Sequence, residues 1–387
     1  MYLKEEFMNG LGEPMSLRLN HIDSMRGFAI LCMVQVHTAA LLPAPVSTTH
    51  PLAFISAAIG GMAAPMFVTI SGWGLHSGIT KRKQNEEPIL KWTIARGLIL
   101  ILLQFIIGIL LPQRYNWNSP GILTLLGLCI LIAPLTASKD ELFTKWMKSK
   151  ETGFFKSIVI VLFTILLLNY CPNLIPGPDW SSMINVNSIL HWFQLAFISG
   201  TYPLIPWIAF YYVGSNLQGK QLNENWKLHL TRSGSLAIST LLATLAISIS
   251  TGTNWAETMG EGVLTFFPAN HWFVLVSASW TIFLWDIFRL SGKWISTINS
   301  WLAPSGRLSL TIYILHFGLL GQIVDYIPEL TLIEAFGITL LHMGIWLLFG
   351  IMHEKFKINW SIEHVIRIIV KTNQYTDSTK SIENRDN

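Results

Sequence analysis

Ten apolar runs separated by short polar loops constrain this 387-residue chain more than any other feature. Each run is long enough, or nearly so, to cross the hydrocarbon core of a bilayer, which takes about 20 residues of helix. In lipid the backbone must satisfy its own hydrogen bonds, so such runs are expected to be helices. We predict an all-α, polytopic membrane protein with spans at 24–43, 52–75, 92–111, 119–137, 154–171, 203–218, 234–251, 271–290, 308–324 and 331–352.

Composition agrees with a membrane protein and excludes an ordinary soluble domain. Hydrophobic residues make up 51% of the chain, charged residues 12%, and mean hydropathy is +0.46. A soluble domain carries about twice that charge. The three cysteines have no metal-site or disulfide spacing. The first apolar run follows a polar stretch with no small-residue cleavage site, so no cleavable signal peptide is expected.

Positive charge sets the predicted orientation. Of the 26 Lys and Arg residues, all except Arg114 lie in the N-terminal segment, in alternate loops and in the tail, or beside them. Basic residues favour the cytoplasmic side, so ten spans with both termini cytoplasmic are expected. The loops concerned are 76–91, 138–153, 219–233 and 290–307.

The same pattern divides the chain into three parts. Residues 1–23 are predicted to be a cytoplasmic segment and residues 24–352 the transmembrane domain. Residues 353–387 form a cytoplasmic tail, in which 353–371 is expected to be an interfacial amphipathic helix before a disordered end.

The richest stretch for chemistry is RLNHIDSMRGFAILCMVQVH, from Arg18 to His37. Asp23 and Arg26 are three residues apart, so they share a helical face and can pair. His37 follows about three turns later, at a depth where a structural span would carry an aliphatic residue. Ionisable residues are costly in a membrane and usually functional there.

His50 lies beyond the short uncharged loop that follows His37. Histidine suits proton transfer near neutral pH, so two histidines flanking one outer loop are candidate catalytic groups. Taken alone, His37 equally fits an intramembrane histidine with satisfied hydrogen bonds, and His50 an ordinary loop residue. His316 and His342 are expected within the last two spans.

Four basic residues lie at cytoplasmic ends of predicted spans: Arg26, Lys91, Arg96 and Arg307. One interpretation is that they reach toward lipid headgroups. The other is a basic collar that binds a phosphorylated small molecule. The sequence has no Gly-rich phosphate loop and no metal-ligand cluster, so no metal is expected.

Four motifs in order give a family resemblance: RLNHIDSMRGFAILCMVQVH, PMFVTISGWGL, YPLIPWIAFYYVGSNLQGK and APSGRLSLTIYILH. Together they resemble the heparan-α-glucosaminide N-acetyltransferase-like family of the transmembrane acyltransferase superfamily, over about residues 18–320. The resemblance implies a bundle of about ten or eleven helices. It also implies that acetyl-CoA is taken from the cytoplasm and that a sugar amine or hydroxyl is acetylated on the far side.

The resemblance also implies roles for individual residues. Animal members have their active histidine about 14 residues before a Pro-x-Phe-Val-x-x-x-Gly segment, and His50 precedes Pro65 by 15. Where those members have Asn at the end of the first span, this chain has His37. We therefore expect His50 to be the base and His37 its partner, although the opposite assignment stays open.

The collar would then hold acetyl-CoA as co-substrate through Arg26, Arg96 and Arg307, with Asp23 orienting Arg26. Expected partners are the lipid bilayer, the acyl donor and a sugar or glycan acceptor, with no nucleic acid and a homodimer left open. The cell membrane is the expected location. The alternative is a proton-coupled transporter or lipid- or glycan-handling protein, against which stands the lack of an inverted repeat.

Overall fold

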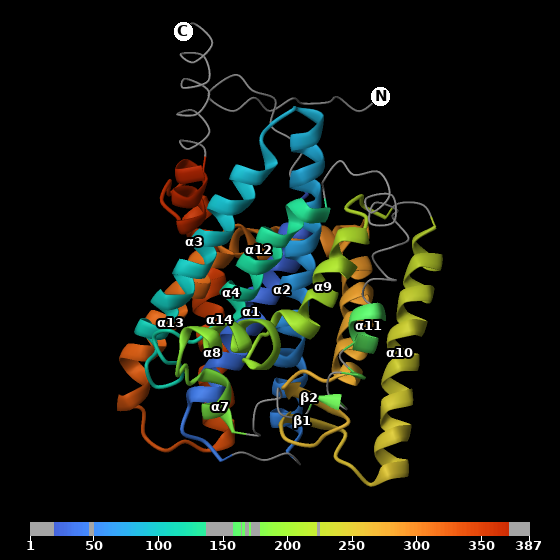
Figure 1. The fold of residues 1–387 in the computed structure, drawn as a ribbon, viewed down its shortest axis with the longest axis vertical. Helices are drawn as coiled ribbons and strands as arrows, with labels where there is room; N and C mark the ends of the chain where they lie inside the picture. Colours follow the sequence, from blue (N-terminus) through green and yellow to red (C-terminus); the bar gives the residue numbers. More distant parts are fainter. Residues whose placement is uncertain are drawn as a thin grey trace, which may run out of the picture.

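Long helices dominate the fold and run side by side (Figure 1). The computed structural model describes residues 19–45, 50–136, 158–163, 165–166, 170–171, 179–222 and 225–370. The longer helices are α1 (Asn20–Leu41), α2 (Pro51–Gln84), α3 (Ile89–Leu110), α4 (Ile122–Ile132), α9 (Leu204–Asn216), α10 (Trp226–Thr251), α11 (His271–Phe288), α12 (Lys293–Arg307), α13 (Ser309–Ile323) and α14 (Leu332–Lys355).

Short elements connect them. They are η1 (Ala133–Thr136), α7 (Trp180–Ile184), α8 (Ile189–Gln194), η3 (Leu195–Ser199) and η4 (Val324–Tyr326). Two short strands, β1 (Ala256–Met259) and β2 (Leu264–Phe267), pair in parallel between α10 and α11.

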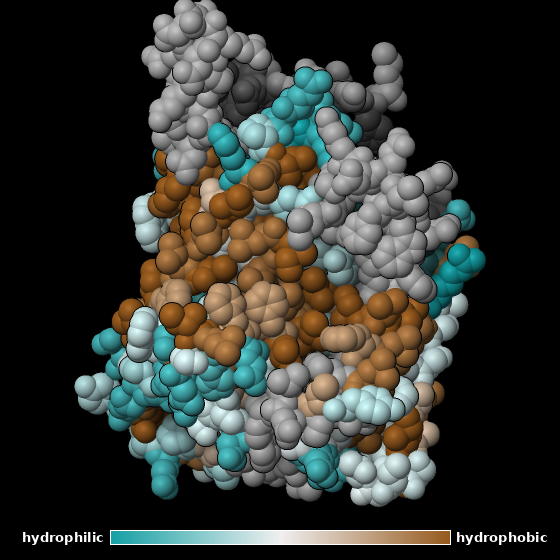
Figure 2. Space-filling model, viewed as in Figure 1, coloured by the Kyte–Doolittle hydropathy of each residue, from teal (hydrophilic) through white to brown (hydrophobic). Residues whose placement is uncertain are grey.

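An apolar band crosses the middle of the bundle on the face drawn in Figure 2, with hydrophilic residues above and below it. Large apolar side chains point outward along the helices; Leu102, Ile109 and Leu341 are each more than 60% exposed. Such a surface requires lipid rather than water around it. The predicted fold class, an all-α polytopic membrane protein, is confirmed.

Eight of the ten predicted spans correspond to segments that can cross a membrane. Six described helices are long and apolar enough alone, and two bent helix pairs, α8–η3 with α9 and α12 with α13–η4, bring the number to eight. In the predicted span 119–137, α4 is apolar but has only 11 residues. The predicted span 154–171 lies mostly outside the described residues.

Most of the predicted cytoplasmic loop at 290–307 is a helix. Residues 293–307 form α12, which lies against α1 and bends by 69° from α13. The loop was predicted because α12 carries polar residues such as Lys293 and Ser300 on its exposed side. Its buried side uses the small residues Ala303 and Gly306, which give little hydropathy signal.

Glycine permits the close crossing of α1 and α12. A Cβ atom at Gly306 would collide with the backbone of Asp23, and one at Gly27 with the backbone of Leu302. Small residues of this kind let membrane helices approach through their backbones. The crossing fixes Asp23 beside the C-terminal end of α12.

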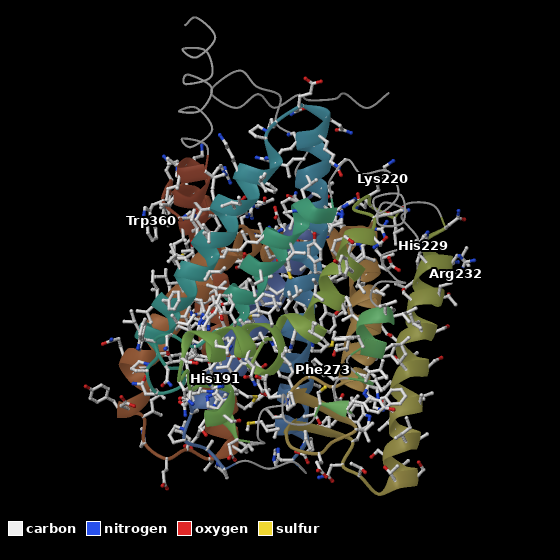
Figure 3. The ribbon with its side chains drawn as sticks, viewed as in Figure 1. His191, Lys220, His229, Arg232, Phe273 and Trp360 are labelled. Carbon is white, nitrogen blue, oxygen red and sulfur yellow. The ribbon has the colours of Figure 1, made fainter. Side chains whose placement is uncertain are left out.

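We call the end of the bundle where α1 begins and where α2 and α14 end the basic end, and the other the opposite end (Figure 1). Figure 3 shows Lys220, His229 and Arg232 toward the basic end and His191 toward the opposite end.

The helices at the two ends of the chain differ from those predicted. Helix α1 begins at Asn20, inside the predicted N-terminal segment 1–23. At the other end, α14 continues to Lys355, and a separate helix forms at 362–370 instead of one helix over 353–371. The predicted disordered end lies outside the described residues.

Candidate active site

His37 and His316 form a hydrogen-bonded pair near the opposite end of α1. His37 Nδ1 lies 2.9 Å from His316 Nε2, and the two rings are nearly parallel, 9° apart. His316 Nδ1 lies 3.0 Å from the carbonyl oxygen of Ile312, one turn earlier in α13. The pair therefore connects the first motif of the sequence to the last.

These contacts determine where the protons lie. A carbonyl oxygen only accepts, so His316 Nδ1 carries a proton and donates to Ile312. In neutral His316 the Nε2 atom is then an acceptor, and His37 Nδ1 must donate to it. His37 Nε2 is left with a lone pair. His316 is fully buried whereas His37 is partly exposed, so the unused lone pair belongs to the more exposed histidine of the pair.

Aromatic rings surround this pair. Phe317 lies 4.5 Å from the His37 ring centre, and Tyr313 lies 6.1 Å from it. Tyr115 contacts Phe317 edge-on at 6.1 Å and Trp180 at 5.8 Å. The rings form a continuous wall from α13 to α7.

Arg114 brings positive charge to the same wall. Its guanidinium lies 3.7 Å from the Trp180 ring centre, and the Trp180 indole N–H donates to the Arg114 carbonyl oxygen at 2.9 Å. Its charge interacts with that of His37. Burial raises the pKa of the neighbouring Tyr115, so its hydroxyl keeps its proton. Arg114 is thus a fixed cation near the histidine pair.

His50 lies at the start of α2, after the short loop that follows α1. It caps α2, where its Nδ1 accepts a hydrogen bond from the Leu52 backbone N–H at 3.2 Å. No hydrogen bond or ring contact between His50 and His37 is found among the described residues, while residues 46–49 of the connecting loop lie outside them. His50 is partly exposed at the opposite end.

His342 of α14 lies beside Thr38, the residue after His37 in α1, but both of its ring nitrogens are already hydrogen-bonded. Its Nδ1 lies 2.7 Å from Thr38 Oγ1, and its Nε2 accepts from the Trp346 indole N–H at 2.7 Å. Thr38 donates its hydroxyl proton to the Val34 carbonyl oxygen, so His342 donates to Thr38. Both ring nitrogens are used, which indicates a structural role.

At the basic end, Asp23 connects two helices. Its carboxylate lies 3.2 Å from the Arg26 guanidinium and 3.7 Å from that of Arg307 at the end of α12. Arg307 also donates two hydrogen bonds to Glu354 of α14, at 2.9 and 2.7 Å. The expected pairing of Asp23 with Arg26 is therefore present, and Arg307 ties α12 to α1 and α14.

Two further arginines share the ring of Trp92. The guanidinium of Arg82 lies 4.0 Å from the centre of that ring and the guanidinium of Arg96 lies 5.7 Å from it. The charge of Arg96 is repelled by those of Arg26 and Arg82. We call Arg26, Arg82 and Arg96 the arginine cluster. Glu87 lies 3.5 Å from Arg82, but Arg96 has no ion-pair partner within the described part of the chain.

A comparison with protein-family models shows which family the chain belongs to. The catalytic-domain model of heparan-alpha-glucosaminide N-acetyltransferase matches residues 18–249, about three fifths of the chain. The chain belongs to this family. It is therefore an integral, multi-pass membrane protein of an acetyltransferase type, and the resemblance predicted from the motifs is confirmed. A comparison with curated proteins gave no match.

The match ends before α11, so His316 and Glu354 lie beyond the matched segment. Sequence reasoning missed the pairing of His37 with His316, and it did not select Arg82. The only available signals were a histidine within the span 308–324 and an arginine beside the predicted collar. Within the described ranges, no three His, Cys, Asp or Glu side chains gather as a metal site would require.

Proposed function

We propose that this protein transfers an acetyl group from cytoplasmic acetyl-CoA to a sugar amine or hydroxyl at the opposite end, with His37 as the general base. One observation carries the proposal: the hydrogen bonds of His316 leave His37 Nε2 with an unused lone pair, on a side chain that is partly exposed. Positive charge favours the cytoplasmic side of a membrane, so the basic end faces the cytoplasm, and we propose the cell membrane as the location.

The arginine cluster and His37 are at a suitable separation for one bound donor. Arg26 and His37 lie on α1, eleven residues apart, which is about 16 Å along a helix. Phosphates of CoA bound by the cluster would leave the pantetheine arm to extend along α1 and bring the thioester to His37. Guanidinium groups bind phosphate through paired hydrogen bonds. Arg307, already bound to Glu354, would hold α12 in place instead.

His37 Nε2 removes the proton from the acceptor amine or hydroxyl as that atom attacks the thioester carbonyl carbon. The tetrahedral oxyanion collapses, the C–S bond breaks, and the leaving thiolate takes the proton from His37. His316 accepts the Nδ1 proton of His37 in a hydrogen bond throughout, which stabilises the imidazolium that forms and fixes the ring.

Arg114 supplies charge on the acceptor side. Its guanidinium is held against Trp180, so its position near the thioester carbonyl would require little reorganisation. Preorganised positive charge of this kind stabilises an oxyanion. The exposed face of Trp117 and the ring of Trp180 provide flat apolar surfaces of the kind that pack against a sugar ring.

This proposal exchanges the two histidine roles expected from the sequence. His50 caps α2 through one ring nitrogen, and its other nitrogen is available at the opposite end. We propose that it orients the acceptor.

Acetyl transfer across sealed vesicles tests the function. Purified protein is reconstituted so that acetyl-CoA reaches only the basic end, and a hexosamine or an envelope glycan extract is enclosed on the other side. Labelled acetyl groups should appear on the enclosed acceptor. Label that stays on the donor side would contradict the proposed direction. Acceptor movement without acetylation would favour the transporter alternative.

A further inference from the structure

The helix at 362–370 docks on the rest of the protein. Ile362, Ile366 and Val370 are spaced four residues apart and lie against the hydrophobic core. Val365 and Ile368 point away and are 40% and 51% exposed. Figure 1 draws this helix at the basic end, where α3 begins. One apolar face is therefore fixed by the bundle.

Glu363 fixes the position of this helix relative to α13. Its carboxylate accepts hydrogen bonds from the backbone N–H groups of Leu310 and Thr311, at 2.7 and 3.2 Å, and from the Thr311 hydroxyl at 2.5 Å. The Ile362 N–H donates back to the Thr311 hydroxyl at 2.9 Å. The amides belong to the first turn of α13, directly after the bend at Leu308, where they have no partner within the helix. An acidic group also suits the positive end of a helix.

Arg367 lies one helical turn after Glu363, on the same side of the helix. Glu363 is already engaged with α13, and no ion pair is found for Arg367 among the described residues. The charge of Arg367 instead repels that of Arg96, together with Arg26 and Arg82. Arg26, Arg82 and Arg367, on three different helices, are thus each near enough to Arg96 for their charges to act on it.

Such a gathering is unfavourable on its own, because like charges held near each other repel. A polyanion with several phosphate groups removes this cost by binding between them. The bonds of Glu363 to α13 hold the last helix in place, and Arg367 lies on the side of that helix that carries Glu363.

We propose that the helix at 362–370 is part of the donor site: Arg367 binds a phosphate group of acyl-CoA, and Glu363 is the positioning residue that holds it there. The inference rests on the proposed function, which gives the arginine cluster its ligand.

Donor binding and steady-state kinetics of the full-length protein test this. Arg367→Ala should weaken acetyl-CoA binding and raise the donor KM by about tenfold, the range for losing one charged hydrogen-bonded contact. The kcat at saturating donor, the acceptor KM and the Tm should stay unchanged, because only binding energy is lost. Arg367→Lys should recover part of the affinity. Lys293→Ala is the matched control: it removes an exposed cation at the far end of α12, about 21 Å along the helix from Arg307.

Glu363→Gln separates positioning from general disruption. It should raise the donor KM less than Arg367→Ala does, and adding it to Arg367→Ala should cause no further rise, since both changes act through one contact. If wild-type protein binds acetyl-CoA and Arg367→Ala binds it equally well, this inference is wrong and the proposed function stands. If wild-type protein binds no acetyl-CoA, the proposed function fails first.

Discussion

At the scale of single residues, the hydrogen-bond partners of each histidine distinguish one that can act as a base from those that have a structural role. His37 has one partner and a remaining lone pair, His316 gives both nitrogens to fixed partners, and His342 does the same. Only the first can take a proton without breaking a buried hydrogen bond. Side-chain type alone could not distinguish them, because all three are histidines within apolar runs.

The role of His316 can be tested by changing what it offers to His37. His316→Ala should lower kcat by on the order of tenfold to hundredfold, less than loss of the base itself, because His37 then loses its orientation. His316→Gln should retain more activity, since its side-chain carbonyl can accept the same hydrogen bond. Turnover with labelled acetyl-CoA measures both. Equal activity in wild type and His316→Ala would show that the hydrogen bond between His37 and His316 has no part in the reaction.

His342 should instead be important for stability. His342→Ala leaves the Trp346 indole N–H without its acceptor in a buried site and removes the donor to Thr38, a loss of about 1–3 kcal/mol. The Tm in detergent should fall, while kcat of the folded fraction should change less than for His316→Ala. A large loss of kcat at unchanged Tm would assign His342 to the reaction.

At the scale of elements, the crossing of α1 and α12 decides whether the basic end forms. Gly306→Ala places a methyl group against the Asp23 backbone, and the helices must separate. We expect a lower Tm and weaker acetyl-CoA binding, because Arg26 on α1 moves with the crossing. Gly74→Ala is the control: a Cβ there meets no atom within 4 Å. A Gly306→Ala variant with the Tm and acetyl-CoA binding of the wild type would contradict the close crossing of α1 and α12.

The helices also show how much of the fold could be predicted from the sequence. Hydropathy and the alternation of basic residues predicted most of the long helices, because a helix surrounded by lipid must be apolar and basic residues favour the cytoplasmic side. They missed α12, whose contact face uses Ala303 and Gly306 rather than large apolar residues. They also could not pair His37 with His316, since 279 residues separate the two and no periodicity connects different helices.

At the scale of the whole molecule, the two ends of the bundle differ in the residues that they carry. The basic end carries the arginine cluster, where we propose that the phosphorylated donor binds, and the opposite end carries His37, His50 and aromatic rings, where we propose that the acceptor binds. Reporter fusions after residues 85 and 225 should read as cytoplasmic, and fusions after 260 and 328 as external. The donor and acceptor sides would have to be exchanged if these readings were reversed.

The most direct test of the central claim compares turnover in purified His37→Ala and His50→Ala, with acetyl-CoA binding measured on the same samples. Removing a general base costs on the order of 10²–10⁴ in rate. We predict a loss of this size for His37→Ala with donor affinity unchanged, and a smaller loss for His50→Ala. Near-normal turnover in His37→Ala would contradict the account, and a loss confined to His50→Ala would assign the base to His50.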